Sequence, residues 1–304
     1  MFTRWLPIVI SVFHLHGALP FASRAFHKNF LVFYNLKQLL TANKSAKERG
    51  TRFFHNMKPL DFGVQSYCFR NFKDNSTVAR KVRGIGLDKI EVCGIHADFS
   101  KPDAFVEVVD TYRKEGVAIV SIGVQTFEGK EGERAWFECA AAAGAKHISA
   151  HFKIENFLTA IPKVRAWSRE FGIQVGIHCH GGYMFGGQPD VLRYLLALGG
   201  PEIGLCIDTA WCMQIGAWHG KPVEWAREFA GKITGIHYKD FIFEKNGSWK
   251  DVIVGTGNLD LPAFVDALTD GGFDGMSVIE YEADPENPDP ALKQCVDSMR
   301  SIKK

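Results

Sequence analysis

The sequence Gly235-Ile236-His237-Tyr238-Lys239-Asp240 reads as the carboxyl end of a buried β-strand. Side chains two positions apart leave a strand on the same face, so His237 and Lys239 point in the same direction. A hydrophobic core does not favour an imidazole beside an ammonium group, because both cost free energy to bury. The mouth of a barrel, where strand ends carry an active site, accommodates such a pair. This strand end therefore indicates both the fold and the place of the site.

Three further segments end in polar side chains in the same manner. They are Gly176-Ile177-His178-Cys179-His180, Gly204-Leu205-Cys206-Ile207-Asp208 and Val278-Ile279-Glu280-Tyr281-Glu282. Asp208 follows His178 by 30 residues and precedes His237 by 29, and one strand–helix unit is roughly 30 residues long. These residues therefore occupy equivalent heights on neighbouring strands. Glu280 follows His237 by 43 residues, and the excess fits a hairpin insertion around residues 245–249.

Strand-like and helix-like segments alternate from residue 57 to the end of the chain. The strands are expected at residues 63–69, 89–93, 117–122, 146–152, 173–178, 203–208, 233–239 and 276–282. Such alternation predicts an α/β protein built from βαβ units, and eight units in about 245 residues match a (β/α)8 TIM barrel over residues 57–304. An open doubly wound sheet is the alternative. It is disfavoured because the alternation is unbroken and no glycine-rich phosphate-binding motif follows the first strand.

The composition is that of an ordinary globular protein, with 46% hydrophobic and 23% charged residues among 304. The formal net charge of +2, with mixed signs along the chain, argues against a nucleic-acid-binding protein, which usually carries a basic stripe. The seven cysteines include no C-x-x-C pair, so neither a zinc cluster nor a disulfide framework is indicated. We expect buried free thiols in a reducing compartment, and hence a cytoplasmic protein.

Residues 1–56 differ from the rest of the chain. The apolar stretch 5–22 loosely resembles a signal peptide, but His14 and His16 interrupt it and it is too short for a membrane span. Met57-Lys58-Pro59-Leu60 resembles a natural protein start. We expect residues 1–56 to be an extension from a misplaced start or a disordered leader that precedes the barrel. Export through residues 1–24 and a membrane anchor are the alternatives, and no membrane partner is predicted.

The strand-end residues His178, Asp208, His237 and Glu280 predict a shared metal site. Each of them alone has a structural explanation, as a buried histidine, a helix cap or turn, or a salt-bridge partner. Four such residues at matching positions on consecutive strands are hard to explain in that way. A mixed nitrogen and carboxylate set with open positions suits one divalent ion, which could be Mn²⁺, Co²⁺, Zn²⁺ or Mg²⁺. His180 is the alternative ligand to His178.

A second group of residues is predicted to surround this site. Lys239 could hold a substrate oxygen or act as an acid, Glu282 could orient Lys239 or act as a base, and His180 could carry a proton. The residues expected to contact substrate are Glu91, His151, Trp211 and Phe127. The last two would form an aromatic wall for stacking a sugar. Surface salt bridges, interior polar contacts and ordinary packing are the alternatives.

The barrel over residues 58–304 resembles the xylose-isomerase-like sugar phosphate isomerase/epimerase superfamily, also called the AP endonuclease family 2 barrels. The matching motifs are GVQSY (63–67), GIHCHGG (176–182), GLCIDT (204–209), GIHYKD (235–240), GTGNLD (255–260) and VIEYE (278–282). The resemblance implies one divalent metal held from strands five to eight, with Asp208, His237 and Glu280 among its ligands. Ketose epimerases of this superfamily have a glutamate, acting as ligand and base, where this chain has His178.

The predicted function is a divalent-metal-dependent isomerase or epimerase that acts on a sugar, sugar phosphate or cyclitol through a metal-stabilised enediolate. Glu280 or His180 would move the proton, and Lys239 would stabilise the developing oxyanion. A lyase or dehydratase, including an enzyme that cleaves keto-glycosides, starts from the same enolate and is the main alternative. Because His178 replaces a glutamate, dehydration, C–O or C–C lysis and a one-base isomerisation all stay open.

Two functions from other classes fit the sequence less well. An abasic-site endonuclease of this superfamily would need a three-metal cluster with more ligands and a basic DNA-binding face, and the small net charge argues against it. A non-catalytic sugar-binding barrel would bind its ligand without a metal. We therefore expect a small carbohydrate substrate and no nucleic-acid partner, and the sequence leaves homo-oligomerisation open.

Overall fold

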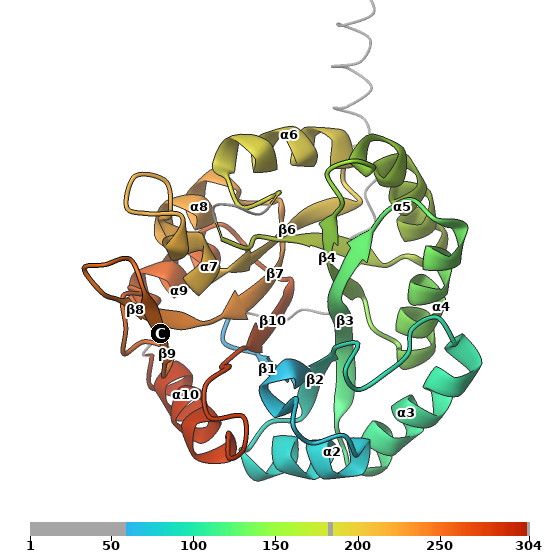
Figure 1. Cartoon of the computed structure of the whole chain (residues 1–304), viewed down its shortest axis with the longest axis horizontal. Helices are drawn as coiled ribbons and strands as arrows, with labels where there is room; N and C mark the ends of the chain where they lie inside the picture. The colour runs from blue at the N-terminus through green and yellow to red at the C-terminus, as the bar shows by residue number, and fades with distance from the viewer. Residues whose placement is uncertain (1–58, 182–184, 303–304) are drawn as a thin grey trace, which may run out of the picture. The chain divides into compact units, whose positions relative to one another are not determined.

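A computed structural model describes residues 59–181 and 185–302, and the predictions for residues 1–56, including their boundary with the barrel, lie outside this range. Eight parallel strands close into a barrel in the order β1-β10-β7-β6-β5-β4-β3-β2 (Figure 1). Their bounds are β1 Gly63–Gln65, β2 Lys89–Val92, β3 Ala118–Phe127, β4 His147–Phe152, β5 Gln174–His178, β6 Ile203–Asp208, β7 Ile233–Tyr238 and β10 Met276–Ile279. The structure confirms the predicted TIM barrel.

Helices form the outer ring around the strands (Figure 1). They are α2 Asn75–Gly84, α3 Pro102–Lys114, α4 Arg134–Ala143, α5 Phe157–Phe171, α6 Pro189–Gly199, α8 Pro222–Glu228, α9 Leu261–Asp270 and α10 Asp289–Ser301, together with the short α7 Thr209–Gln214 and the 3₁₀ turns η1 Ser66–Phe69 and η2 Glu131–Glu133. Pro102, Pro189 and Pro222 stand in the first turn of their helices, where the missing backbone N–H costs no hydrogen bond. The apolar core lies between this ring and the strands.

Several strands end earlier than the sequence predicts, and one ends later. β1 stops at Gln65 because the Gln65 side chain accepts the N–H of Tyr67 at 3.1 Å and starts a 3₁₀ turn. β7 ends at Tyr238 and β10 at Ile279, so the polar residues that follow them lie just beyond the strands. β3 instead continues to Phe127, five residues past its predicted end at residue 122.

The inside of the barrel is polar below the carboxyl ends of the strands. The imidazole of His147, at the start of β4, shares a hydrogen bond of 3.0 Å with Ser121 Oγ. A Cβ at Gly176 would lie 2.5 Å from His147 Nε2, and a Cβ at Gly235 would lie 2.9 Å from the same atom. Glycine at these two positions therefore makes room for a buried imidazole inside the barrel.

The predicted insertion after β7 is an antiparallel hairpin of β8 Asp240–Phe243 and β9 Trp249–Val252, which lies outside the ring of strands (Figure 1). The Asp240 carboxylate anchors the chain as it returns from this hairpin. It accepts backbone N–H groups from Gly255, Gly257 and Leu259 at 2.8–3.0 Å. A Cβ at Gly257 would lie 2.6 Å from Asp240 Oδ1, which explains the glycine there.

All seven cysteines lie in the described part of the chain, where each is buried and free, as the sequence predicts. Within residues 59–181 and 185–302, no helix combines the length and the hydropathy that crossing a bilayer requires.

Candidate metal centre

Four residues from neighbouring strands converge at the carboxyl end of the barrel. His178 ends β5, Asp208 ends β6, His237 lies near the end of β7, and Glu280 directly follows β10. Asp208 and His237 are direct register partners between β6 and β7, and the backbone N–H of Glu280 donates to the carbonyl of Tyr238 at 2.9 Å. The equivalent heights predicted from sequence spacing are therefore produced by parallel strand pairing.

The donor atoms of these four residues all lie within 4.8 Å of one another. His178 Nε2 lies 3.2 Å from His237 Nδ1 and 3.6 Å from Asp208 Oδ2. His237 Nδ1 lies 3.1 Å from Glu280 Oε2. Two ligands about 2.1 Å from one ion, at tetrahedral or octahedral angles, are separated by about 3.0–3.4 Å. The spacing therefore fits one divalent cation at the centre of the four atoms.

The hydrogen bonding of Asp208 supports the same fit. Asp208 is fully buried, and its Oδ1 accepts the backbone N–H of Trp211 at 2.8 Å, which caps α7. Its other oxygen, Oδ2, is buried without a hydrogen-bond donor among the described residues. A buried carboxylate oxygen without a partner costs free energy, which a cation at the cluster would offset.

Burial and neighbouring charges set the protonation of the cluster. Burial and the adjacent His237 lower the pKa of His178 to about 3, so its imidazole is neutral and can offer a lone pair. Burial raises the pKa of Asp208 to about 7, so this carboxyl requires a positive partner to remain ionised. Burial would also raise the pKa of Glu280, but Lys239 and His237 outweigh it and lower the pKa below its usual value.

The cluster opens into a pocket of about 420 Å³ at the mouth of the barrel. Its lining residues are Gln65, Tyr67, Cys93, Gly94, Ile95, Gly123, Val124, His151, His178, His180, Trp211, Glu280 and Glu282.

The His180 ring stacks on the Trp211 indole, with centroids 4.1 Å apart and planes inclined by 22°. Burial, with His178, lowers the pKa of His180 to about 4, so this imidazole is neutral at physiological pH. His151 lies edge-on to His178, with centroids 5.3 Å apart.

Lys239 lies beside the pocket in a buried group of charges. Its side chain is 1% exposed, it forms a salt bridge with Glu282, and its Nζ lies 3.9 Å from Asp251 Oδ2. Asp251, on β9, also accepts the backbone N–H of Glu282 at 2.8 Å. Glu282 lines the pocket and Lys239 does not, so the ammonium group lies behind the Glu282 carboxylate as seen from the pocket.

Two of the residues predicted to contact substrate lie elsewhere. Glu91 is fully buried beneath His237 and is not part of the pocket lining. Phe127 is also fully buried, and its ring packs on Trp136 and Phe152 with centroids 4.9 and 5.6 Å away. The structure therefore brings His151 and Trp211 to the pocket, and leaves Glu91 and Phe127 outside it.

The structure also adds residues that the sequence analysis did not single out. Gln65 lines the pocket from β1, and its position two residues after Gly63, on the inner face of that strand, was a usable signal. No sequence pattern indicated that Asp251 lies near the site, because its position depends on the path of the β8–β9 hairpin.

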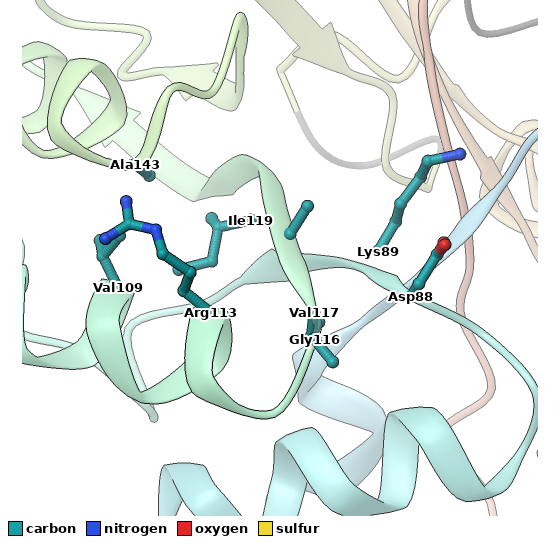
Figure 2. A pocket seen from close by; sticks show the side chains of 9 residues that line it. Asp88, Lys89, Val109, Arg113, Gly116, Val117, Ile119 and Ala143 are labelled. Atoms are coloured by element: carbon teal, nitrogen blue, oxygen red, sulfur yellow. The ribbon is translucent and has the colours of Figure 1, made fainter.

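A second pocket, of about 360 Å³, lies at the opposite ends of β2 and β3. Figure 2 shows Val109 and Arg113 on one side of it and Asp88 and Lys89 on the other. Among the residues that the structure describes, no histidine or cysteine lines this pocket. Barrel enzymes carry their catalytic groups at the carboxyl ends of the strands, so the metal-centre pocket is the better candidate for an active site.

The sequence model of one protein family, described as "Xylose isomerase-like TIM barrel", matches residues 79–304. This chain belongs to that family. The match confirms the resemblance that was inferred from the strand-end motifs.

Among curated relatives, the chain is 28% identical over 135 residues to the rhizopine catabolism protein MocC of Rhizobium meliloti, and the match covers 40% of each chain. It is 23% identical over 223 residues to an inosose dehydratase of Mesomycoplasma hyopneumoniae strain J, covering 67% of this chain and 69% of that one. The match to MocC thus spans less than half of that protein's length. The D-allulose 3-epimerase structure from Methylomonas sp. superposes with a TM-score of 0.63 at 14% identity, covering 82% of this chain and 99% of that one, which shows the shared fold.

Proposed function

We propose that this chain is a divalent-metal-dependent isomerase or epimerase that acts on a polyhydroxylated ketone, either a sugar or a cyclitol. The observation that carries the proposal is the four-donor cluster of His178, Asp208, His237 and Glu280, which opens into a pocket lined by further ionisable groups. A cation site beside acid–base residues supports removal of the proton next to a carbonyl group.

A divalent ion held by these residues would act as a Lewis acid on the carbonyl and a neighbouring hydroxyl of the substrate. His180 is the candidate base. Its ring is neutral, its Nδ1 has no hydrogen-bond partner among the described residues, and stacking on Trp211 fixes its plane. A neutral imidazole of fixed orientation offers a free lone pair that can take a proton from carbon.

Glu282 is the candidate for the second proton transfer. Burial, with the charge of Glu280, raises its pKa, whereas the salt bridge with Lys239 opposes this rise and holds the carboxyl in place. A carboxyl group with a raised pKa in a pocket is suited to general acid–base chemistry. Lys239 would orient Glu282 and contribute positive charge from behind it.

The charges of the pocket favour a substrate without a phosphate group. Two carboxylates, Glu280 and Glu282, face the pocket, and no lysine or arginine is among its described lining residues. A phosphate carries about two negative charges near neutral pH, and its recognition normally uses cationic side chains. We therefore narrow the predicted substrates to the unphosphorylated sugar or cyclitol.

Dehydration is the second candidate, and one relationship favours it. Of the two curated relatives described above, the one that this chain covers more fully is an inosose dehydratase. Dehydration begins with the same proton removal and then expels a β-hydroxyl group, for which Glu282 could supply the proton. His178, in place of a carboxylate at the end of β5, leaves the pocket with fewer bases for a two-base epimerisation.

One experiment tests both candidates. The full chain, loaded in turn with Mn²⁺, Co²⁺, Zn²⁺ and Mg²⁺, is incubated with ketoses and keto-cyclitols in D₂O and analysed by NMR. Deuterium next to the carbonyl in an isomerised product supports the isomerase, and a dehydrated product supports the second candidate. If the metal-loaded chain exchanges no such proton in any of these compounds, both candidates fail.

A further inference from the structure

His237 faces the candidate metal centre with one ring nitrogen and a buried carboxylate with the other. Its Nδ1 points at the donor cluster, 3.1 Å from Glu280 Oε2. Its Nε2 lies 3.4 Å from Glu91 Oε2 and 3.4 Å from Ser149 Oγ. Both His237 and Glu91 are completely buried. The imidazole is therefore held between the cluster above it and a carboxylate below it.

The Glu91 carboxylate is fixed by neighbours on three strands. Gln65 Nε2 donates to Oε1 at 2.8 Å, and Ser149 Oγ donates to Oε2 at 2.9 Å. Gly123, on β3, leaves space for it, because a Cβ there would lie 3.0 Å from Glu91 Oε1. These contacts hold the second oxygen of the carboxylate toward His237.

Among the described residues, only His237 lies within ion-pair distance of the Glu91 carboxylate. Burying a carboxylate costs free energy. Within residues 59–181 and 185–302, Glu91 is neither in the pocket lining nor paired with a lysine or an arginine. A contact with substrate does not explain its position. An effect on the metal centre, exerted through His237, does explain why Glu91 is buried at this position.

We propose that Glu91 is a positioning residue for the metal centre. It accepts the Nε2–H of His237, which fixes the tautomer, leaves the Nδ1 lone pair directed at the cation and sets the plane of the ring. This inference rests on the proposed metal centre. In this proposal the polar residues inside β1, β2 and β4 also have a function, because Gln65 and Ser149 hold the Glu91 carboxylate in place.

The test compares the affinity of Co²⁺ for the full-length wild type and for Glu91→Gln. Glutamine has the same shape but lacks the charge, so the affinity should fall about 10- to 100-fold. The visible absorption spectrum of the bound Co²⁺ should also change, which a purely structural role would not cause. Ser121→Ala is the matched control. It removes a buried hydroxyl that bonds to His147 rather than to His237, and it should leave the affinity unchanged.

The outcomes separate the two proposals. If the wild type binds no divalent cation, or if Asp208→Asn binds as tightly as the wild type, the metal centre itself is refuted. If Asp208→Asn weakens binding but Glu91→Gln keeps the wild-type affinity and spectrum, only the role of Glu91 is refuted. Should Glu91→Gln fail to fold, Glu91→Asp carries the same test. Its withdrawn carboxylate should weaken Co²⁺ binding, and unchanged binding would overturn the inference.

Discussion

Asp208 caps helix α7 by accepting the backbone N–H of Trp211 at 2.8 Å, and this bond turns its other oxygen toward the metal centre. The same short helix places the Trp211 ring in the pocket, where it stacks on His180. The Asp208 carboxylate thus connects the candidate metal centre to the Trp211 ring that lines the pocket.

Asp208→Asn should separate metal binding from helix stability. Asparagine caps helices about as well as aspartate, so the unfolding temperature of the metal-free protein should change little. The affinity for a divalent ion should fall by about 100-fold or more, because an anionic ligand is lost. Calorimetric titration with Co²⁺ and metal analysis of the purified variant measure this. Stoichiometric metal in the variant at wild-type affinity would contradict the assignment of Asp208.

Metal binding should strengthen as the pH rises. Burial raises the pKa of Asp208 to about 7, and the pKa of His237 is raised well above its ordinary value, because the neighbouring Cys206, Glu91 and Glu280 outweigh burial. Both groups must lose a proton to act as ligands, so acid opposes binding. Below pH 7 the affinity should drop about tenfold or more for each pH unit. Calorimetry in buffers of different ionisation enthalpy counts the protons released, and a constant affinity from acid to neutral pH would disagree with this account.

Lys239→Met should destabilise the protein, and more strongly at high pH. The substitution leaves the carboxyl groups of Glu282 and Asp251 without their cation, which should cost about 3–5 kcal/mol at pH 8. Burial raises the pKa of Asp251 to about 7 even with Lys239 present. A carboxyl with a raised folded-state pKa lowers stability as the pH rises, and protonation relieves this, so the loss should shrink toward pH 5.

Urea unfolding of Lys239→Met at pH 5 and pH 8 measures this difference. Lys250→Met is the control, because Lys250 lies on the same hairpin with its side chain 75% exposed and should change stability little at either pH. An equal loss at both pH values would show that Lys239 acts through packing rather than through charge.

Trp211→Leu should impair catalysis while leaving the metal in place. The substitution removes the ring that orients His180 and lines the pocket, so kcat/KM should fall about tenfold or more. Trp218→Leu is a matched control, because Trp218 is 90% exposed and lies outside the pocket. Steady-state kinetics on the substrate found in the D₂O screen provide the measurement. Equal effects of the two substitutions would remove Trp211 from the site.

The strand ends were predictable because two simple periodicities determine them. Alternation along a strand selects the inward face, and the regular spacing of βα units sets the height of each strand end, which together bring His178, Asp208, His237 and Glu280 to one level. These quantities are local in the sequence, so no knowledge of tertiary packing was needed.

The same reasoning could not place residues whose depth depends on packing. Glu91 shares the inward face of β2, but alternation does not reveal that it lies one layer below the pocket. Phe127 belongs to the extension of β3 past residue 122, so its ring packs with Phe152 and Trp136 outside the pocket. Asp251 reaches Lys239 only because the β8–β9 hairpin folds back, a path that the local sequence does not specify.

Diffraction from crystals of the full chain grown with Co²⁺ or Mn²⁺, measured at the absorption edge of the metal, tests the central claim most directly. We predict one strong anomalous peak about 2.0–2.3 Å from His178 Nε2, Asp208 Oδ2, His237 Nδ1 and Glu280 Oε2. A chain that crystallises with saturating metal and shows no peak between these four atoms, or shows its ion at other residues, would contradict it.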